Sequence, residues 1–305
     1  MRVKSFNLKK TKEKYLKFIK SQETSVMSFQ NKIDQLNNFY IPISEIISKD
    51  YEKHGNTRVI GLSGAQGTGK STIAEILKII LKEKYNLETI IFSIDNFYKT
   101  LKERKKMSEK ESELFLTRGV PGTHDTKILI NCFKKIKKKS FKKFLIPKFD
   151  KSLDDRLKKN KWIKVKKKPH IVIFEGWCVG ASAQSKSSLK KPINELERKQ
   201  DKNLMWRLKV NSELQKDYKK IFKLISISIF LKVPNFKYVY QWRTLQEMKL
   251  KKNSKGKKTM DNFQIKRFIM FYERITRNML KILNLKSKLV IDIDTKHRLK
   301  SIKIN

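Results

Sequence analysis

The chain has 305 residues, of which 39% are hydrophobic and 33% charged, and its formal net charge at pH 7 is +44. This length allows a sizeable buried core. The two cysteines, Cys132 and Cys178, are far apart and lack metal-ligand spacing, which excludes a disulfide framework and a zinc site. No secretory signal and no apolar run long enough to span a bilayer are present, so we expect a soluble, cytoplasmic protein without a membrane partner.

The positive charge has two interpretations. A basic surface can bind nucleic acid or an anionic membrane. Alternatively, lysine fills exposed positions in a chain that is also rich in Ile, Asn and Phe, all of which have A/T-rich codons. Lysines are dense at 134–168 but frequent almost everywhere, and arginine, which suits bidentate phosphate contacts, is scarce. We therefore expect no specific nucleic-acid partner, although the charge would attract an anionic substrate such as ATP in either case.

The first part of the chain predicts helices, and the rest predicts alternating strands and helices. We expect residues 1–56 to be a helical N-terminal extension, since apolar residues recur there with partial helical spacing and Pro42 stands where a helix can begin. Apolar runs predict strands at 57–63, 89–94, 170–174, 225–233 and 288–292, and helical spacing predicts helices near 71–85, 107–117, 126–138, 192–222, 235–251 and 261–283. This alternation favours an α/β fold of three layers, with a mainly parallel sheet covered by helices on both faces.

A phosphate-binding loop follows the first predicted strand. Residues Gly64-Ala-Gln-Gly-Thr-Gly-Lys-Ser71 match G-x-x-x-x-G-K-[ST], and the preceding strand and following helix are the context that this motif requires. Its glycines let backbone N–H groups turn toward anionic oxygens, and the start of the helix adds a positive dipole end. Lys70 can reach the β- and γ-phosphates, and Ser71 can bind Mg²⁺. We predict a P-loop NTPase fold in which ATP is bound by Gly64, Ala65, Gln66, Gly67, Thr68, Gly69, Lys70, Ser71 and Thr72.

Two carboxylates follow the next two strands, at the same edge of the predicted sheet. Asp95 could accept the proton of a substrate hydroxyl or hold the Mg²⁺ shell. Glu175 comes directly after an apolar strand, as a Walker-B acid does, and would orient Mg²⁺ or bind a substrate hydroxyl. The alternatives are an ordinary turn aspartate and a strand-capping acid. Because ligands bind beyond the carboxyl ends of parallel strands, we expect Asp95, Glu175 and Ser71 at one metal site.

Two polar loops could bind the acceptor. The first, Arg118-Gly-Val-Pro-Gly-Thr-His-Asp125, offers donors and acceptors for a small polar substrate, although a lone histidine is more often structural. The second, 147–156, could equally be a solvated turn. The substrate-binding candidates are Arg118, His124, Asp125, Asp150 and Arg156.

Arg243 is a further candidate, within a predicted helix. It could pair with Glu247 four residues later, or it could swing over the triphosphate and neutralise charge that develops during transfer. The basic, glycine-containing stretch 249–258 that follows is either a mobile lid or a solvated connector.

In this order, the segments resemble those of the plant-type D-glycerate 3-kinase family and its bacterial and fungal P-loop relatives. The resemblance covers roughly residues 40–293, and it rests on residues 64–72, 93–98, 118–125, 147–156, 174–181, 240–247 and 271–277. More distantly, the layout is similar to that of uridine kinase, phosphoribulokinase and the bacterial pantothenate kinases.

The resemblance implies a monomeric or weakly associating kinase that transfers the γ-phosphoryl group of ATP to the primary hydroxyl of D-glycerate. Where the family tends to have Asp-Asp-Phe-Tyr, this chain has Asn96, so the catalytic role stays with Asp95 alone. We expect a kinase domain at 57–305, with substrate loops at 118–160 and a candidate lid at 243–260. Its catalytic residues would be Lys70, Asp95, Glu175 and Arg243.

Alternatives remain for the acceptor and for the class of protein. A nucleoside or pantothenate offers a primary hydroxyl to the same catalytic groups. The basic surface could instead belong to a nucleic-acid-dependent ATPase or a polynucleotide kinase. A kinase-like scaffold without turnover is disfavoured, because the candidate catalytic groups are all present.

Nucleic acid itself tests the second alternative. The sequence has no aromatic–basic binding motif of the RRM type, so we predict that RNA or DNA leaves the rate of ATP hydrolysis unchanged and that strand ends stay unlabelled. ADP release with and without nucleic acid, and transfer of labelled phosphate to strand ends, measure this directly. Stimulated hydrolysis or labelled ends would favour the nucleic-acid alternative.

Overall fold

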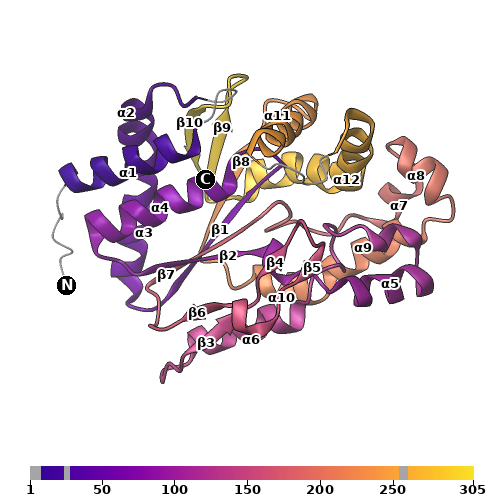
Figure 1. Cartoon of the computed structure of the whole chain (residues 1–305), viewed down its shortest axis with the longest axis horizontal. Helices are drawn as coiled ribbons and strands as arrows, with labels where there is room; N and C mark the ends of the chain where they lie inside the picture. Colours follow the sequence, from indigo (N-terminus) through magenta and orange to yellow (C-terminus); the bar gives the residue numbers. More distant parts are fainter. Residues whose placement is uncertain (1–7, 24–27, 254–259) are drawn as a thin grey trace.

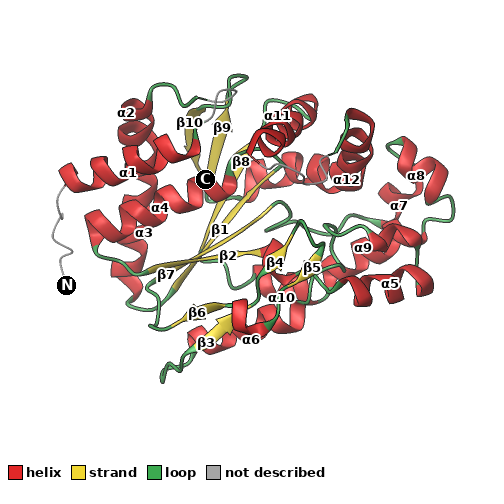
Figure 2. Cartoon of the chain, viewed as in Figure 1, coloured by secondary structure: helices red, strands yellow, loops and turns green. Residues whose placement is uncertain are grey.

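The computed structural model describes residues 8–23, 28–253 and 260–305. A six-stranded sheet of order β10-β9-β8-β1-β7-β2 lies at the centre, with helices on both faces (Figures 1 and 2). Its strands are β1 (Arg58–Gly64), β2 (Thr89–Ser93), β7 (Ile171–Gly176), β8 (Ile227–Lys232), β9 (Leu289–Ile293) and β10 (Leu299–Ile304). The strand pairs from β2 to β9 are parallel, and β10 pairs antiparallel with β9. The predicted three-layer P-loop fold is confirmed.

The remaining elements surround this sheet. The helices are α1 (Leu8–Gln22), α2 (Lys32–Gln35), α3 (Ile41–His54), α4 (Lys70–Tyr85), α5 (Leu101–Lys110), α6 (Thr126–Lys137), α7 (Lys186–Lys190), α8 (Glu195–Gln200), α9 (Met205–Gln215), α10 (Asp217–Phe222), α11 (Lys237–Asn253) and α12 (Asn262–Lys286). Short helical turns are η1 (Leu36–Tyr40), η2 (Ile94–Phe97), η3 (Glu113–Leu116) and η4 (Lys159–Lys161). Two small antiparallel sheets pair β3 (Phe144–Ile146) with β6 (Ile163–Val165) and, in a hairpin, β4 (Phe149–Asp150) with β5 (Asp155–Arg156). No helix among the described residues is long and apolar enough to cross a membrane.

Two predicted helices differ from the observed ones. The predicted helix at 107–117 is α5 followed by η3, because Thr100 and Glu103 form a capping box that starts α5 earlier. The predicted helix at 192–222 is divided into α8, α9 and α10. Asp201 interrupts it, since its carboxylate accepts hydrogen bonds from the backbone N–H groups of Trp206 and Arg207 at the start of α9.

Alternating residues of the central strands bury opposite faces of the sheet. On β7, Val172 and Phe174 belong to a core shared with α6, α9 and α12, whereas Ile171 and Ile173 belong to a core shared with α3 and α4. All four side chains are fully buried, as expected for a strand covered on both sides. The continuous apolar run in the sequence therefore corresponds to two helix-covered faces.

The N-terminal helices contribute to the second of these cores. Helices α1 and α3 lie beside α4, which follows the P-loop (Figure 1). Tyr15 and Ile19 of α1 and Ile43 of α3 are buried in the same apolar cluster as residues of α4. The side-chain amide of Gln35 also pairs with both backbone groups of Leu299, donating to its oxygen at 2.9 Å and accepting from its nitrogen at 3.0 Å. These contacts attach the N-terminal segment both to α4 and to the start of β10.

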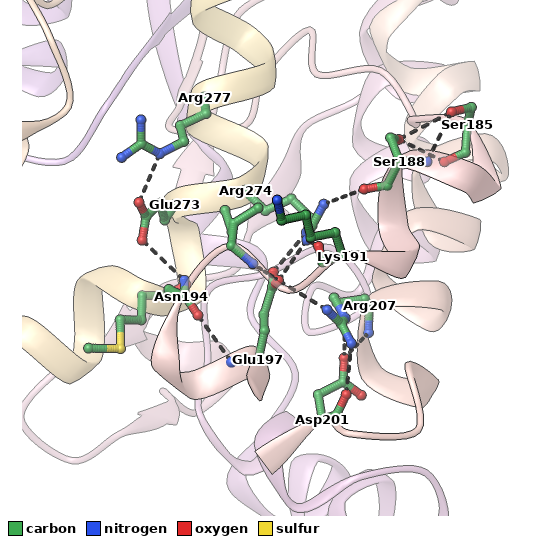
Figure 3. A network of polar contacts seen from close by, with 12 residues as sticks. Ser185, Ser188, Lys191, Asn194, Glu197, Asp201, Arg207, Glu273, Arg274 and Arg277 are labelled. Carbon is green, nitrogen blue, oxygen red and sulfur yellow. Dashed lines mark hydrogen bonds and ion pairs between the residues drawn. The ribbon is translucent and has the colours of Figure 1, made fainter. Parts of the chain in front are cut away.

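A buried ionic network joins α8, α9 and α12 (Figure 3). The fully buried carboxylate of Glu197 accepts from Arg274 of α12 at 2.6 Å and from Arg207 of α9 at 3.3 Å. Arg207 also pairs with Asp201 at 2.8 Å. Since each charge has a partner of opposite sign, the network fixes α12 without leaving an uncompensated ion.

Removing the central carboxylate tests the contribution of this network. We predict that Glu197→Ala lowers the free energy of unfolding by about 3–5 kcal/mol, because it removes the carboxylate that pairs with Arg274 and leaves Arg207 with Asp201 alone. Urea unfolding measures this. The matched control is Glu195→Ala on the same helix, an exposed side chain paired with Lys199, which should change stability little. Equal stability of the two variants would contradict a structural role for the network.

Candidate active site

Three neighbouring strands bring the predicted site residues to one edge of the sheet. In the register of β7, Glu175 lies beside Leu62 of β1 and beside Ser93 of β2. The P-loop continues from β1, and Asp95 lies in η2 directly after β2. Because all three strands are parallel, their carboxyl ends meet, and Glu175 lies between the loop and Asp95.

The P-loop has the backbone conformation that its glycines allow. Gly67 and Gly69 both have a φ of +80°, in the left-handed region, and Gly69 is the N-cap of α4. A Cβ at Gly67 would also lie 2.8 Å from the Cβ of Trp242 on α11. The loop is therefore packed against α11, and the N-terminus of α4 points its free N–H groups toward the loop, as an anion-binding site requires.

Lys70 and Ser71, at the start of α4, lie beside the buried Glu175. Lys70 Nζ donates to the carbonyl oxygen of Ala65 at 2.8 Å, and Ser71 Oγ donates to Glu175 Oε1 at 3.2 Å. Burial raises the pKa of Glu175, and the Lys70 ammonium opposes that shift. Burial lowers the pKa of Lys70, and the carboxylates of Glu175 and Asp95 oppose it. Anionic phosphate oxygens beside Lys70 would favour its charged form further.

Asp95 is held ionised by its neighbours. The Tyr98 hydroxyl donates to Oδ1 at 2.7 Å, and Lys151 Nζ donates to Oδ2 at 2.6 Å. Burial alone would raise the pKa of Asp95, but the Lys151 ammonium and the two hydrogen bonds outweigh it and hold the pKa well below its usual range. At neutral pH, Asp95 is therefore a carboxylate that can accept a hydrogen bond from a hydroxyl.

The loop at 118–125 brings Arg118 and His124 close to Asp95. Arg118 pairs with Asp154 and lies over the ring of Phe149, 5.4 Å from its centroid. His124 is buried, stacks on Tyr98 with ring centroids 4.7 Å apart, and contacts the Tyr218 hydroxyl through Nδ1 at 2.6 Å. Its Nε2 has no hydrogen-bond partner among the residues described.

Three other predicted substrate residues, Asp125, Asp150 and Arg156, form contacts that stabilise the loops. Asp125 caps α6 and pairs with Arg156 at 3.3 Å, and Arg156 donates to the carbonyl oxygen of Tyr98 at 2.8 Å. The Asp150 carboxylate accepts from the backbone N–H groups of Ser152 and Leu153, which shapes the turn of the β4–β5 hairpin. These contacts position the backbone around Asp95, and each of the three side chains bonds to another group of the chain.

Arg243 forms the ion pair with Glu247 that its spacing predicts. The two side chains are 2.7 Å apart and largely buried, and the guanidinium lies over the ring of Phe268. Arg243 also affects the pKa of Tyr272, which is raised mainly by burial and further by Asp95, so it is close to the site. Of the candidate lid at 243–260, residues 254–259 lie outside the part of the chain that the structure describes.

The structure adds residues that the sequence analysis missed. Tyr98 and Lys151 contact Asp95, and the Tyr272 hydroxyl donates to the backbone oxygen of Arg118 at 3.1 Å. Arg104 is fully buried and donates to the carbonyl oxygens of Leu116 at 2.5 Å and Asp154 at 2.6 Å. Both tyrosines and Lys151 lie inside segments that carry the family resemblance, which is the one signal that could have found them.

A cavity of about 210 Å³ lies beside the P-loop. Thr68, Gly69 and Thr72 line it on one side, the N-terminal segment with Phe29 on another, and the β9–β10 turn with His297 on a third. The ring of His297 stacks on that of Trp242, with centroids 4.5 Å apart. The cavity therefore adjoins the first turn of α4, next to the phosphate-binding loop.

Comparisons with known proteins agree with this geometry. The model of the phosphoribulokinase / uridine kinase family matches residues 59–210. The chain is 33% identical over 245 residues to the Schizosaccharomyces pombe protein described as uncharacterized kinase mug58, covering 75% of this chain and 83% of that one. It is 27% identical over 222 residues to the chloroplastic D-glycerate 3-kinase of Arabidopsis thaliana, covering 70% of this chain and 46% of that one. A structure of D-glycerate 3-kinase from Cryptococcus neoformans shares the fold, with a TM-score of 0.72 at 23% identity over 87% of this chain and 99% of that one.

The protonation state of His124 gives a pH-dependent prediction. Burial lowers the pKa of His124 from 6.5 to about 3, so below pH 6.5 the unfolded chain binds a proton that the folded protein does not. This group alone should reduce stability by up to about 1.4 kcal/mol per pH unit as the pH falls toward 3. Urea unfolding at several pH values should therefore show that the difference in free energy of unfolding between wild type and His124→Phe becomes smaller as the pH falls. A constant difference would contradict a neutral, buried His124.

Proposed function

The chain belongs to the phosphoribulokinase/uridine kinase family of ATP-dependent small-molecule kinases, and on that premise we propose that it phosphorylates D-glycerate at its primary hydroxyl. The observation that carries this proposal is the ionised Asp95 beside the P-loop, together with the cationic groups around it. The similarity to the Arabidopsis D-glycerate 3-kinase supports the choice of acceptor.

Asp95 acts on the acceptor hydroxyl. The hydroxyl oxygen forms a bond to the γ-phosphorus of ATP, the bond from that phosphorus to the bridging oxygen breaks, and ADP leaves. Asp95 accepts the hydroxyl proton during this transfer. The low pKa of Asp95 suits a transition state in which bond breaking is advanced, because the hydroxyl then needs orientation more than early deprotonation.

Lys70 and the loop amides bind the phosphates. The ammonium of Lys70 would exchange the Ala65 carbonyl oxygen for phosphate oxygens, and Arg243 would add positive charge on the α11 side. Because this chemistry consists mainly of positioning and charge stabilisation, the rigid packing of the loop against α11 contributes directly to it.

The residues present fit a bound Mg²⁺. Ser71 Oγ and the Glu175 carboxylate are already in contact, and they would hold the ion together with phosphate oxygens. No cluster of three or more histidine, cysteine or acidic side chains suited to a metal occurs within residues 8–23, 28–253 and 260–305. Mg²⁺ in kinases needs one or two carboxylates because substrate phosphates complete its shell, and when bound it neutralises charge on them.

We place the nucleoside of ATP in the cavity beside Thr72. The cavity adjoins the first turn of α4 and is lined by aromatic side chains such as Phe29, which can pack on a base. The triphosphate would then extend along the P-loop toward Lys70, with its terminal phosphoryl group facing Asp95. In this arrangement the nucleoside and the acceptor occupy different sides of the site. The P-loop and the loop at 118–125 would then meet at the sheet edge where the phosphoryl group is transferred.

A panel of acceptors tests the proposed substrate. With Mg-ATP, ADP release should be well above background for D-glycerate and much lower for uridine, ribulose 5-phosphate and pantothenate. Faster ADP release with uridine or pantothenate than with D-glycerate would show that D-glycerate is not the preferred acceptor. The proposal that the protein is a kinase would still stand.

Asp95→Asn tests the catalytic carboxylate. We predict that kcat falls by about 10²- to 10⁴-fold while KM for ATP stays unchanged, because the amide keeps the size of the side chain but cannot take up the proton. Steady-state kinetics measure both constants, and the exposed Asp34→Asn serves as the control. Turnover at the wild-type rate would show that Asp95 does not have this role.

A further inference from the structure

The ion pair between Lys151 and Asp95 joins the candidate catalytic carboxylate to an exposed side chain. Lys151 Nζ lies 2.6 Å from Asp95 Oδ2, and the two side chains are 64% and 28% exposed. The residues are far apart in sequence, and Lys151 lies in the turn of the β4–β5 hairpin. Exposed ion pairs contribute little to stability, so a structural role explains this contact poorly.

The backbone that carries Lys151 is firmly held. Asp154, at the other end of the turn, has a left-handed φ of 54°. The buried Arg104 donates to its carbonyl oxygen at 2.6 Å and pairs with its carboxylate at 3.0 Å, and Arg118 pairs with the same carboxylate. Asp150 closes the turn through the Ser152 N–H at 2.8 Å. The turn is thus fixed in front of Asp95, while the long Lys151 side chain remains in contact with water.

We propose that Lys151 is a specificity-determining residue that binds the carboxylate of the acceptor, an inference that rests on the proposed function. A short hydroxy acid is complementary to the two halves of this ion pair: its hydroxyl donates to Asp95, and its carboxylate accepts from Lys151. Binding therefore inserts the acceptor between the two side chains, and each charge exchanges one partner for another. An uncharged acceptor would satisfy Asp95 and leave Lys151 without its anion.

The other cations close to Asp95 already have different partners. Arg118 pairs with Asp154, Arg243 pairs with Glu247, and Lys70 lies on the P-loop with its ammonium at the Ala65 carbonyl. Lys151 is the neighbour whose ammonium is bound to the catalytic carboxylate itself. The acceptor hydroxyl must approach that carboxylate, and the Lys151 ammonium then lies close to the reacting oxygen. In a small hydroxy acid the carboxylate is only a few bonds from the hydroxyl, so it can reach the ammonium.

Kinetics with a charged and an uncharged acceptor test this inference. Wild type, Lys151→Met, Lys151→Arg and the control Lys148→Met, an exposed lysine of the same loop, are compared with D-glycerate and with D-glyceramide, in which an amide replaces the carboxylate. For Lys151→Met we expect kcat/KM for D-glycerate to fall about 10- to 100-fold, mainly through KM, with KM for ATP unchanged. The preference for D-glycerate over D-glyceramide should fall by the same factor. Lys151→Arg should retain part of the preference for D-glycerate, and Lys148→Met should behave as wild type.

Two results would overturn the role of Lys151 alone. An equal loss with both acceptors would show that Lys151 acts on Asp95 and not on the carboxylate, and an unchanged KM for D-glycerate in Lys151→Met would show that it does not bind the acceptor. Both results leave the proposed function in place, because wild type still phosphorylates D-glycerate. Wild type that is inactive toward D-glycerate would overturn the proposed function, and with it this inference.

Discussion

The buried Glu175 and the partly buried Lys70 lie where three parallel strands end, and the surrounding structure offsets the cost of withdrawing opposite charges from water. Each opposes the pKa shift that burial imposes on the other. The Ala65 carbonyl oxygen and the Ser71 hydroxyl give each charge a hydrogen bond. A bound phosphate would supply negative charge beside the ammonium, so these groups are arranged to receive a charged ligand and contribute little to stability by themselves.

Arginine and lysine have different uses in this protein. The buried or nearly buried guanidinium groups of Arg104, Arg156 and Arg207 each bond to backbone oxygens and to a carboxylate, which uses the several donors of the guanidinium group to join loops and helices. No lysine is fully buried among the described residues, and the exposed Lys151 contacts Asp95, the carboxylate proposed to be catalytic. Several of the few arginines in this basic chain therefore connect loops and helices.

Much of the fold follows from local patterns. The buried residues of the five parallel strands are mostly apolar, and the P-loop needs glycines at fixed positions, so both features can be predicted from the sequence. The edge strand β10 was missed because Leu299–Ile304 mixes lysine and serine with few apolar residues. The break at Asp201 depends on a side chain that caps the next helix. Apart from its place in a segment that carries the family resemblance, nothing in the sequence distinguishes Lys151 among 73 lysine and arginine residues, because the hairpin geometry is what places it beside Asp95.

Direct measurement of nucleotide binding tests the central claim, which is that the P-loop and its buried charges bind a magnesium nucleotide. Titration calorimetry with MgADP avoids turnover and reports on the pocket alone. We predict saturable binding to one site per chain for wild type and a strong loss for Lys70→Ala, with circular dichroism showing that both proteins are folded. Folded wild-type protein that produces no binding heat with MgADP over a range of temperatures would contradict the account.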